Sequence, residues 1–151
     1  MFFHRHRNDV IAGDVVDLSF RCRYPANEQT GETESICFWI NTHGREDKIG
    51  ECDIRLGMND DLHYAGNIGY RIYEAHRGHG YAYEAAKMLM KAGKEIYGMK
   101  EILITCSPDN IASKKTLERL NGELVETVEV PSWHWLYKRG ETVKHVYRFV
   151  L

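Results

Sequence analysis

The chain has 151 residues, of which 43% are hydrophobic and 28% are charged, and its formal net charge is −2. This length fits one domain over residues 1–151, and the near-neutral charge gives no general attraction to nucleic acid or anionic membranes. No apolar run approaches the roughly 20 residues of a membrane span, and the first ten residues lack the apolar stretch of a secretory signal. We therefore expect a cytoplasmic protein without nucleic-acid or membrane partners.

The first half of the chain reads as strands separated by turns. Alternating, β-branched and aromatic residues predict strands over residues 15–23, 35–41, 49–56 and 67–73. Polar turns are expected at 27–34 and 43–48, and a loop at 57–65. Residues 8–47 show no helical periodicity. In the third strand, Gly50, Cys52 and Ile54 share one face, and Glu51, Asp53 and Arg55 share the other.

The periodicity changes in the second half. Apolar residues at helical spacing predict a helix over residues 80–97, and the small residues near its start allow close approach to a sheet. A buried strand at 101–105 follows, which predicts a strand–helix–strand unit with two parallel strands and a right-handed crossover. Asn110 is a suitable N-cap for a second helix, and Gly122 a suitable left-handed residue to end it.

Two further strands, at 123–130 and 142–150, complete the chain. This order predicts an α/β (α+β) domain. Its sheet is mixed and mostly antiparallel, with the parallel strand pair at the centre and helices on its faces.

Cysteine and histidine spacing argues against a metal centre. Four cysteines are present, with no CxxC pair among them: Cys22, Cys37, Cys52 and Cys106. In a reducing compartment we expect these to be small, mostly buried apolar side chains. His4 and His6 have no cysteine near them in sequence to complete a zinc tetrahedron. The sequence therefore predicts no metal.

The stretch EAHRGHGYAYEAA, residues 74–86, carries a phosphate-binding signal. Gly78 and Gly80 allow the backbone to approach a ligand closely, and the helix start presents unpaired N–H groups and about half a positive charge. Arg77 adds a cation. The stretch lacks the third glycine of GxGxxG and the Lys-Ser or Lys-Thr of a Walker A loop. A purely structural turn is the alternative.

Two linked motifs resemble the GNAT N-acetyltransferase superfamily. Arg77-x-x-Gly80-x-Ala82 is similar to its [RQ]-x-x-G-x-[GA] acyl-CoA signature, and ITCSPDNIASKKTLERLNG is similar to its next strand and helix. The N-x-x-S spacing of Asn110 and Ser113 is closest to the branch with the ribosomal-protein acetyltransferases. The resemblance covers roughly residues 49–130. It implies a single GNAT-like domain with a splayed parallel strand pair, acetyl-CoA as co-substrate, and no metal.

The resemblance also implies roles for individual residues. The residues implied to bind the coenzyme are Ile72, Tyr73, Arg77, Gly78, His79, Gly80, Tyr81, Ala82, Asn110 and Ser113. The strand end at Ile72 and Tyr73 would pair with the pantetheine arm. The thioester would enter between Ile72 and either Cys106 or Ser107, and a main-chain N–H near the end of the 67–73 strand would stabilise the oxyanion.

Two departures from the family pattern concern catalysis. Leu117 stands where the family often has a tyrosine general acid, so Ser113 is implied as its substitute. Gly66 and Asn67 stand where relatives carry a glutamate. Glu51, or its neighbour Asp53, is then the candidate base on the adjacent strand.

The acceptor is expected to be a small-molecule or peptide amine. Because residues 8–47 lack the helices that usually wall the acceptor pocket in this family, the wall is either strand and loop or part of a partner subunit, as in a homodimer. Trp133, Trp135 and Tyr137 either line this pocket or an interface, or belong to the core, which clustered aromatics favour. Direct acetyl transfer to a primary amine is the leading interpretation. The alternatives are an inactive acyl-CoA-binding or regulatory module and a nucleotide-binding protein.

Overall fold

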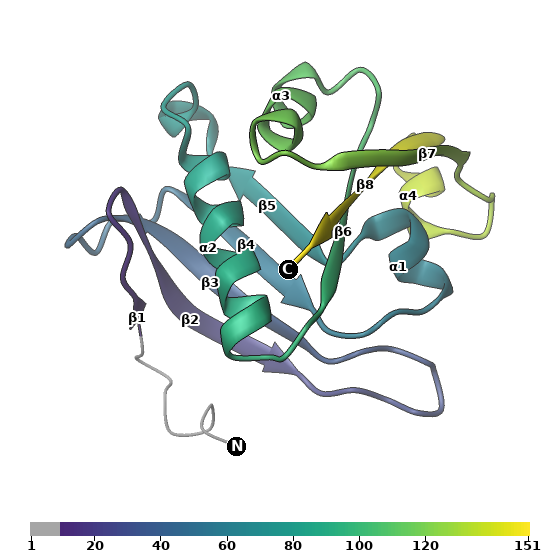
Figure 1. The fold of residues 1–151 in the computed structure, drawn as a ribbon, viewed down its shortest axis with the longest axis horizontal. Coiled ribbons are helices and arrows are strands. Elements are labelled where there is room, and N and C mark those ends of the chain that lie inside the picture. Colours follow the sequence, from purple (N-terminus) through teal and green to yellow (C-terminus); the bar gives the residue numbers. More distant parts are fainter. Residues whose placement is uncertain (1–9) are drawn as a thin grey trace.

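The computed structural model describes residues 10–151, so the interpretations of His4, His6 and the first nine residues lie outside the described part of the chain. Two antiparallel sheets face α2 and α3 (Figure 1). The first sheet has the order β1 (Val10–Ile11), β2 (Val16–Tyr24), β3 (Ser35–Thr42), β4 (Gly50–Arg55) and β5 (Ile68–Ile72). The second has the order β6 (Glu101–Cys106), β8 (Val143–Val150) and β7 (Glu123–Glu129).

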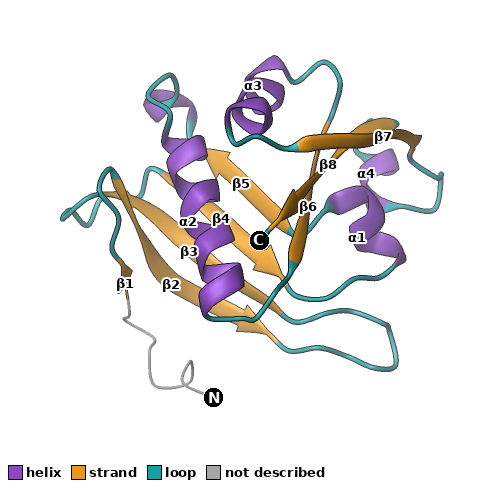
Figure 2. Ribbon diagram, in the orientation of Figure 1, coloured by secondary structure: helices purple, strands orange, loops and turns teal. Residues whose placement is uncertain are grey.

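The helices lie between these strands in the chain (Figure 2). They are α1 (Asp60–Ala65), the 3₁₀ turn η2 (Glu74–His76), α2 (Tyr81–Glu95), α3 (Ile111–Arg119) and α4 (Trp135–Lys138). The strands predicted from periodicity and the two longer helices agree with the structure to within about two residues at each end. Within residues 10–151, no helix is long and apolar enough to cross a bilayer.

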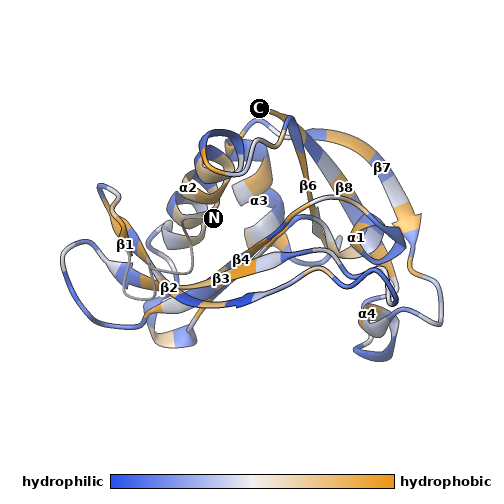
Figure 3. Ribbon diagram, turned by 90° about the horizontal axis from the view of Figure 1, so that it is seen from below, coloured by the Kyte–Doolittle hydropathy of each residue, from blue (hydrophilic) through white to orange (hydrophobic). Residues whose placement is uncertain are grey.

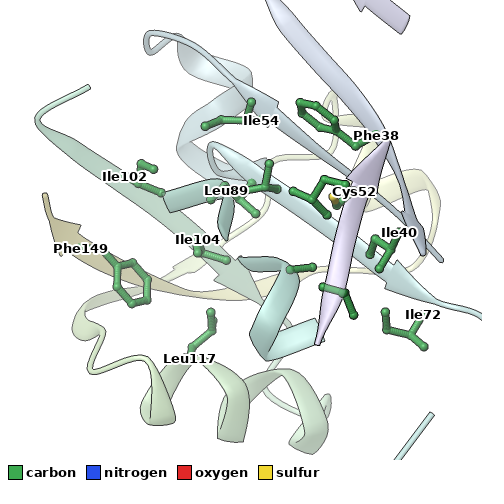
Figure 4. Close-up of a cluster of buried hydrophobic side chains, with 14 of the residues drawn as sticks. Phe38, Ile40, Cys52, Ile54, Ile72, Leu89, Ile102, Ile104, Leu117 and Phe149 are labelled. Carbon is green, nitrogen blue, oxygen red and sulfur yellow. The ribbon is translucent and has the colours of Figure 1, made fainter. Parts of the chain in front are cut away.

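The core lies between α2 and the first sheet and continues to β6 and α3 (Figure 4). Leu89 of α2 is fully buried among the inward side chains of the strands, such as Ile54 and Ile104. Gly93 lets the helix lie close, because a Cβ there would stand 3.0 Å from Ile102 Cδ1 and 3.2 Å from Ile54 Cδ1. The small residues of this helix therefore serve packing, as their spacing predicted.

The opposite face of the first sheet is polar. The odd-numbered residues of β4 point away from the core, because the even-numbered ones are buried against it. In Figure 3, α2 and α3 lie above strands β2 to β4, and α4 lies below them at one end. Residues 10–47 contain strands and loops, as the lack of helical periodicity predicted. Much of this sheet face is therefore open to solvent.

β5 and β6 run in the same direction but belong to different sheets (Figure 1). Asn67 joins them where they begin: its N–H donates to the Leu103 carbonyl (2.6 Å), and its Oδ1 accepts from the Leu103 N–H (2.8 Å). Gly66 allows this approach, because it has φ +77° and a Cβ there would lie 2.9 Å from the Leu103 oxygen. Beyond this point the strands separate. The single mixed sheet predicted from sequence is therefore divided in two at its parallel pair.

Several local expectations are corrected. The predicted loop at 57–65 contains α1, which Asn59 caps by accepting from the Leu62 N–H (2.8 Å). Gly122 is not the left-handed residue after α3; Asn121 is, with φ +64°. Glycine is required at 122 because a Cβ there would lie 2.5 Å from the Phe149 ring. Of the cysteines, all free, Cys52 and Cys106 are buried, whereas Cys22 and Cys37 are half-buried partners across β2 and β3.

Candidate active site

A cavity of about 490 Å³ lies where the end of β5, the glycine turn and α3 meet. Eight of the ten residues implied to bind a coenzyme line it: Ile72, Arg77, Gly78, Gly80, Tyr81, Ala82, Asn110 and Ser113. Tyr73 and His79 are not among its lining residues. The volume is typical of small-molecule sites. Residues from two segments about thirty positions apart are therefore brought to one cavity.

The glycine turn places a helix start at this cavity. Gly78 has φ +90° and Gly80 has φ +75°, which is the left-handed region that glycine occupies without strain. Gly80 precedes the first residue of α2, so the unpaired N–H groups and positive helix end face the turn. Arg119, at the end of α3, adds a second cation near the turn, since its Nη1 lies 3.6 Å from where a Cβ of Gly80 would be. The arrangement suits a phosphate group.

The main chain of β5 presents hydrogen-bonding groups to the gap before β6. Arg55 pairs with Asn67 and Ile49 with Tyr73 through main-chain hydrogen bonds of 2.6 and 2.9 Å. Because bonded pairs alternate in an antiparallel ladder, the groups of Tyr70 and Ile72 point away from β4. The Ile72 carbonyl accepts from Arg77 Nε (2.9 Å). The Tyr73 N–H is thus engaged within the sheet and cannot pair with a pantetheine arm, whereas the N–H groups of Tyr70 and Ile72 face the gap.

A pair of hydroxyl groups closes one end of the cavity. The Tyr70 hydroxyl and Ser113 Oγ are 2.7 Å apart, joining β5 to the start of α3. Burial raises the pKa of Tyr70, against the smaller opposing effect of the Ser113 hydrogen bond, so the phenol is neutral and retains a proton to donate. Asn110 Oδ1 accepts from the Ser113 N–H (3.1 Å), which confirms Asn110 as the N-cap of α3.

A second cavity, of about 500 Å³, meets the first at this hydroxyl pair. Four residues line both: Tyr70, Arg71, Asn110 and Ser113. Cys106 and Ser107, the two candidates for the far lip of the strand gap, line the second cavity. Its floor is the polar face of β4 and β5. The two cavities therefore adjoin at the Tyr70–Ser113 pair.

Three carboxylates line this second cavity. Glu51, the candidate base, accepts from the Tyr73 hydroxyl (2.9 Å) and has Arg21 at 3.8 Å. Asp53 binds Arg55 Nε at 2.7 Å. Glu141 forms salt bridges with Lys144 Nζ at 2.6 Å and with Arg139 Nη2 at 3.2 Å. Burial opposes ionisation of Glu141, but Lys144, Arg139 and the Ser107 hydroxyl hold its pKa below the usual value.

The short helices α1 and α4, which lie near each other in Figure 2, contribute Ala65, Trp135 and Leu136 to the lining of the second cavity. The buried His134 side chain links them, because its Nε2 lies 2.7 Å from Asp61 Oδ1 while its Nδ1 accepts from the Leu136 N–H. Trp135 Nε1 donates to the same Asp61 oxygen (2.8 Å). The wall of the second cavity therefore contains helices that the sequence did not predict, and they follow β4 and β7.

The core interpretation of the aromatic segment is wrong. Trp133, Trp135 and Tyr137 are exposed by 60, 42 and 42%, and the buried residues between them are His134 and Leu136. Trp135 lines the second cavity, and its role at an acceptor pocket or an interface stays a prediction. Trp133 lies in the turn before α4, and Trp135 and Tyr137 lie in α4, where Leu136 takes the buried position between them.

Sequence reasoning missed several residues of the site. Tyr70 is an aromatic residue in a strand, which by itself indicates core packing. Arg71 and Arg119 lie within residues 49–130, which the resemblance covers, but the motifs give these positions no role, and Glu141 lies outside that stretch. The alternation of β5 was the available signal, since Tyr70 shares a face with Ile72, which was expected to lie beside the thioester.

Comparisons with known proteins agree with this geometry. The family model described as an acetyltransferase (GNAT) domain matches residues 14–123. The uncharacterized N-acetyltransferase YjdG of Bacillus subtilis (strain 168) is 34% identical over 70 residues, which cover 46% of this chain and 41% of that protein. The match therefore spans about two fifths of the length of this relative.

Solved structures share the fold. An acetyltransferase of the GNAT family from Bacillus anthracis superposes with a TM-score of 0.61 at 18% identity, over 76% of this chain and 65% of the other. The RimL ribosomal L7/L12 alpha-N-protein acetyltransferase, solved with coenzyme A, superposes with a TM-score of 0.68 at 14% identity, over 95% of this chain and 98% of RimL.

Proposed function

The chain belongs to the acetyltransferase (GNAT) family, and from this premise we propose that it transfers an acetyl group from acetyl-CoA to a primary amine. One observation carries the proposal: the cavity with the phosphate-binding turn ends at the Tyr70–Ser113 pair, where a second, polar cavity begins. A two-substrate transfer needs two binding spaces that meet at the reacting atoms.

The residues of the first cavity fit an elongated, phosphate-bearing thioester. The N–H groups at the start of α2, with Arg77 and Arg119 beside them, would hold the pyrophosphate and neutralise its charge. Gly78, Gly80 and Ala82 leave room for that approach. His79, exposed in the same turn, would contact the coenzyme only from outside the cavity. The main chain of Tyr70 and Ile72 would hold the pantetheine arm.

Acetyl-CoA, when bound, supplies an activated acyl thioester. In the overall transfer a nitrogen–carbon bond forms while the carbon–sulfur bond breaks, the amine gives up a proton and the departing sulfur receives one. The N–H of Tyr70 or Ile72 would hydrogen-bond the reacting carbonyl oxygen. The Tyr70–Ser113 pair would donate to the sulfur, and Glu51 would accept the amine proton through water.

The acceptor is proposed to be a small-molecule or peptide amine that binds over the open face of β4 and β5. Four free thiols and acetyl-CoA as co-substrate favour a cytoplasmic setting. A homodimer that covers the open sheet face is the form in which a second subunit would complete the acceptor wall. No metal takes part in the proposed chemistry.

The test is acetyl-CoA consumption with a panel of amines, followed by mass spectrometry of the acetylated product. We expect amine-dependent release of coenzyme A and a product heavier by one acetyl group. Tight binding of acetyl-CoA with no turnover across the panel would favour the inactive coenzyme-binding module instead. Protection by ATP or NAD without protection by coenzyme A would favour a nucleotide-binding protein.

A further inference from the structure

The second cavity carries an excess of positive charge that the chain as a whole does not. Its charged lining residues are five cations, Arg21, Arg55, Arg71, Arg139 and Lys144, and three carboxylates, Glu51, Asp53 and Glu141. The excess is therefore two positive charges, whereas the whole chain has a formal net charge of −2. A local concentration of one sign of charge in a concave site selects ligands of the opposite sign.

Ion pairs show where this excess lies. Asp53 neutralises Arg55, which also donates to the main-chain carbonyl of Ala65 (3.0 Å), and Glu51 has Arg21 at 3.8 Å. Arg71 forms no ion pair with any carboxylate in the described part of the chain, and stands over the Tyr73 ring at 5.7 Å. Glu51 lies opposite Arg71 in the β4–β5 register, so it can offset either Arg21 or Arg71, and one positive charge is left over between these two arginines.

The second uncompensated charge lies on the opposite wall. Glu141 is shared by two cations, Lys144 at 2.6 Å and Arg139 at 3.2 Å. The Lys144 side chain is only 8% exposed, so its charge is weakly screened, whereas the Arg139 side chain is 64% exposed and can reach a ligand. Positive charge thus lies on both sides of the junction where the amine must attack.

This arrangement has two consequences for an amine substrate. Cations beside an amino group disfavour its protonated form and so increase the fraction of neutral, nucleophilic amine. They also repel a substrate that carries several further positive charges and attract one with an anionic group near the amine. Both effects act on the acceptor and not on the thioester.

Resting on the proposed function, we infer that the acceptor is an amine that carries an anionic group close to the nitrogen. The group is a carboxylate or phosphate held by Arg71 and Arg139. A free amino acid and the acidic N-terminus of a peptide share this chemistry. Polycationic acceptors, such as polyamines and aminoglycosides, do not fit it.

The inference is tested by binding, which needs no turnover. With the protein saturated with coenzyme A, the dissociation constants of N-acetylglycine and N-acetylglycinamide are compared, and likewise those of acetyl-Gly-Asp-amide and acetyl-Gly-Asn-amide. We expect the carboxylate member of at least one pair to bind about tenfold more tightly, with the advantage shrinking at high salt. A larger affinity ratio in the N-acetylglycine pair indicates a free amino acid as acceptor, and a larger ratio in the acetyl-Gly-Asp-amide pair indicates an acidic peptide.

Variants test whether Arg71 and Arg139 cause the preference for the carboxylate ligands. Arg71→Gln and Arg139→Gln should each reduce the ratio of affinities by about threefold or more. Arg139 lines the second cavity alone, so its variant should leave the affinity for coenzyme A unchanged. Lys91→Gln is the matched control, because it removes one exposed charge from α2, away from both cavities, and should leave the ratio unchanged.

The outcomes separate the inference from the proposed function. Equal affinities within each pair, or turnover of spermidine as fast as that of glycine, overturn the inference and leave acetyl transfer intact. Tighter binding of the carboxylate members without acetylation of any amine supports the inference and overturns the proposed function.

Discussion

The hydroxyl groups of Tyr70 and Ser113 lie 2.7 Å apart on two elements that are not joined to each other by a sheet ladder. The position where the family often places its tyrosine is occupied by Leu117, which is fully buried and packs in the core. A phenol therefore reaches the junction from β5 instead of from α3. Because the two hydroxyls are bonded to each other, either can pass a proton to a third group while the other replaces it.

The first prediction concerns this pair. Ser113→Ala and Tyr70→Phe should each lower kcat by roughly ten- to a hundredfold, because a hydrogen bond to the departing sulfur is made mainly in the transition state. The acetyl-CoA dissociation constant should change little. The measurement is steady-state kinetics with a verified acceptor, together with equilibrium binding of the coenzyme.

The double variant distinguishes a cooperating pair from two independent groups. If the hydroxyls act as one unit, Ser113→Ala with Tyr70→Phe should be about as slow as the slower single variant. Turnover of both single variants within twofold of the parent removes the pair from the mechanism and leaves water as the proton source. Weaker coenzyme binding at unchanged kcat assigns the pair to positioning alone.

Gly80 is the residue on which the phosphate site depends. Gly80→Val should weaken coenzyme A binding by at least tenfold, about 1.4 kcal/mol. A β-branched residue is strained at φ +75° and its side chain would occupy the approach to the helix start. Isothermal titration with coenzyme A measures the effect.

The control is Gly98→Val, at φ +67° with no heavy atom within 4 Å of the added Cβ. It imposes a similar backbone strain away from the cavity. Both variants should lose stability, and only Gly80→Val should lose affinity. Unchanged affinity in Gly80→Val would make the turn purely structural.

At the scale of elements, periodicity predicted the long strands and helices because each buries one face over several residues. It missed α1 and α4 because six- and four-residue helices bury one side chain each, Leu62 and Leu136, and have no period to detect. Asn59 followed by Asp60 and Asp61 was the available signal for α1, as a cap and an acidic first turn. The His134–Asp61 link is tertiary and leaves no sequence pattern.

The division into two sheets also follows from single residues. Asn67 is 2% exposed, and its side chain donates to the Arg55 and Gly57 carbonyls (2.9 and 2.8 Å) while accepting from the Leu103 N–H. An asparagine amide therefore ties β5 to β6 and to the end of β4. The sequence showed that this position departs from the family's glutamate, but not that its amide has this structural role.

The third prediction is that Asn67→Leu destabilises the fold by about 2–4 kcal/mol. It removes three hydrogen bonds and leaves three partly or fully buried main-chain groups without their partner. Urea unfolding measures the change. Asn59→Ala, at the half-buried N-cap of α1, should lose about 1 kcal/mol in the same assay. If Asn67→Leu lowers the free energy of unfolding no more than Asn59→Ala does, the Asn67 side chain does not have the proposed role of linking β5 to β6.

At the scale of the whole molecule, the two sheets are joined at one end, where Asn67 contacts Leu103. Beyond this join, β5 and β6 separate and leave a gap that a ligand can span. The lining residues of the first cavity come from β5, the glycine turn, α2 and α3, so a coenzyme bound there would contact both halves of the fold. The resemblance of the motifs predicted which residues line this cavity, because glycine turns and helix caps are formed by residues close together in the sequence. The charge distribution of the second cavity was not predictable, since it depends on which distant strands and helices converge.

The last prediction is that coenzyme A stabilises the folded protein by mass action. At about a hundred times its dissociation constant, a ligand that binds only the folded state adds about 2.7 kcal/mol to the free energy of unfolding. For a chain of this length that corresponds to a rise in Tm of roughly 5–10 °C. Differential scanning fluorimetry with coenzyme A, acetyl-CoA, ATP and NAD at equal concentrations measures it, and the two coenzyme A forms should give the larger shifts. The shift should shrink in Gly80→Val and persist in Gly98→Val, because only the former lies at the helix start that binds phosphate. A shift with NAD or ATP but none with coenzyme A would overturn the assignment of the first cavity, whereas equal shifts in both glycine variants would place the coenzyme elsewhere.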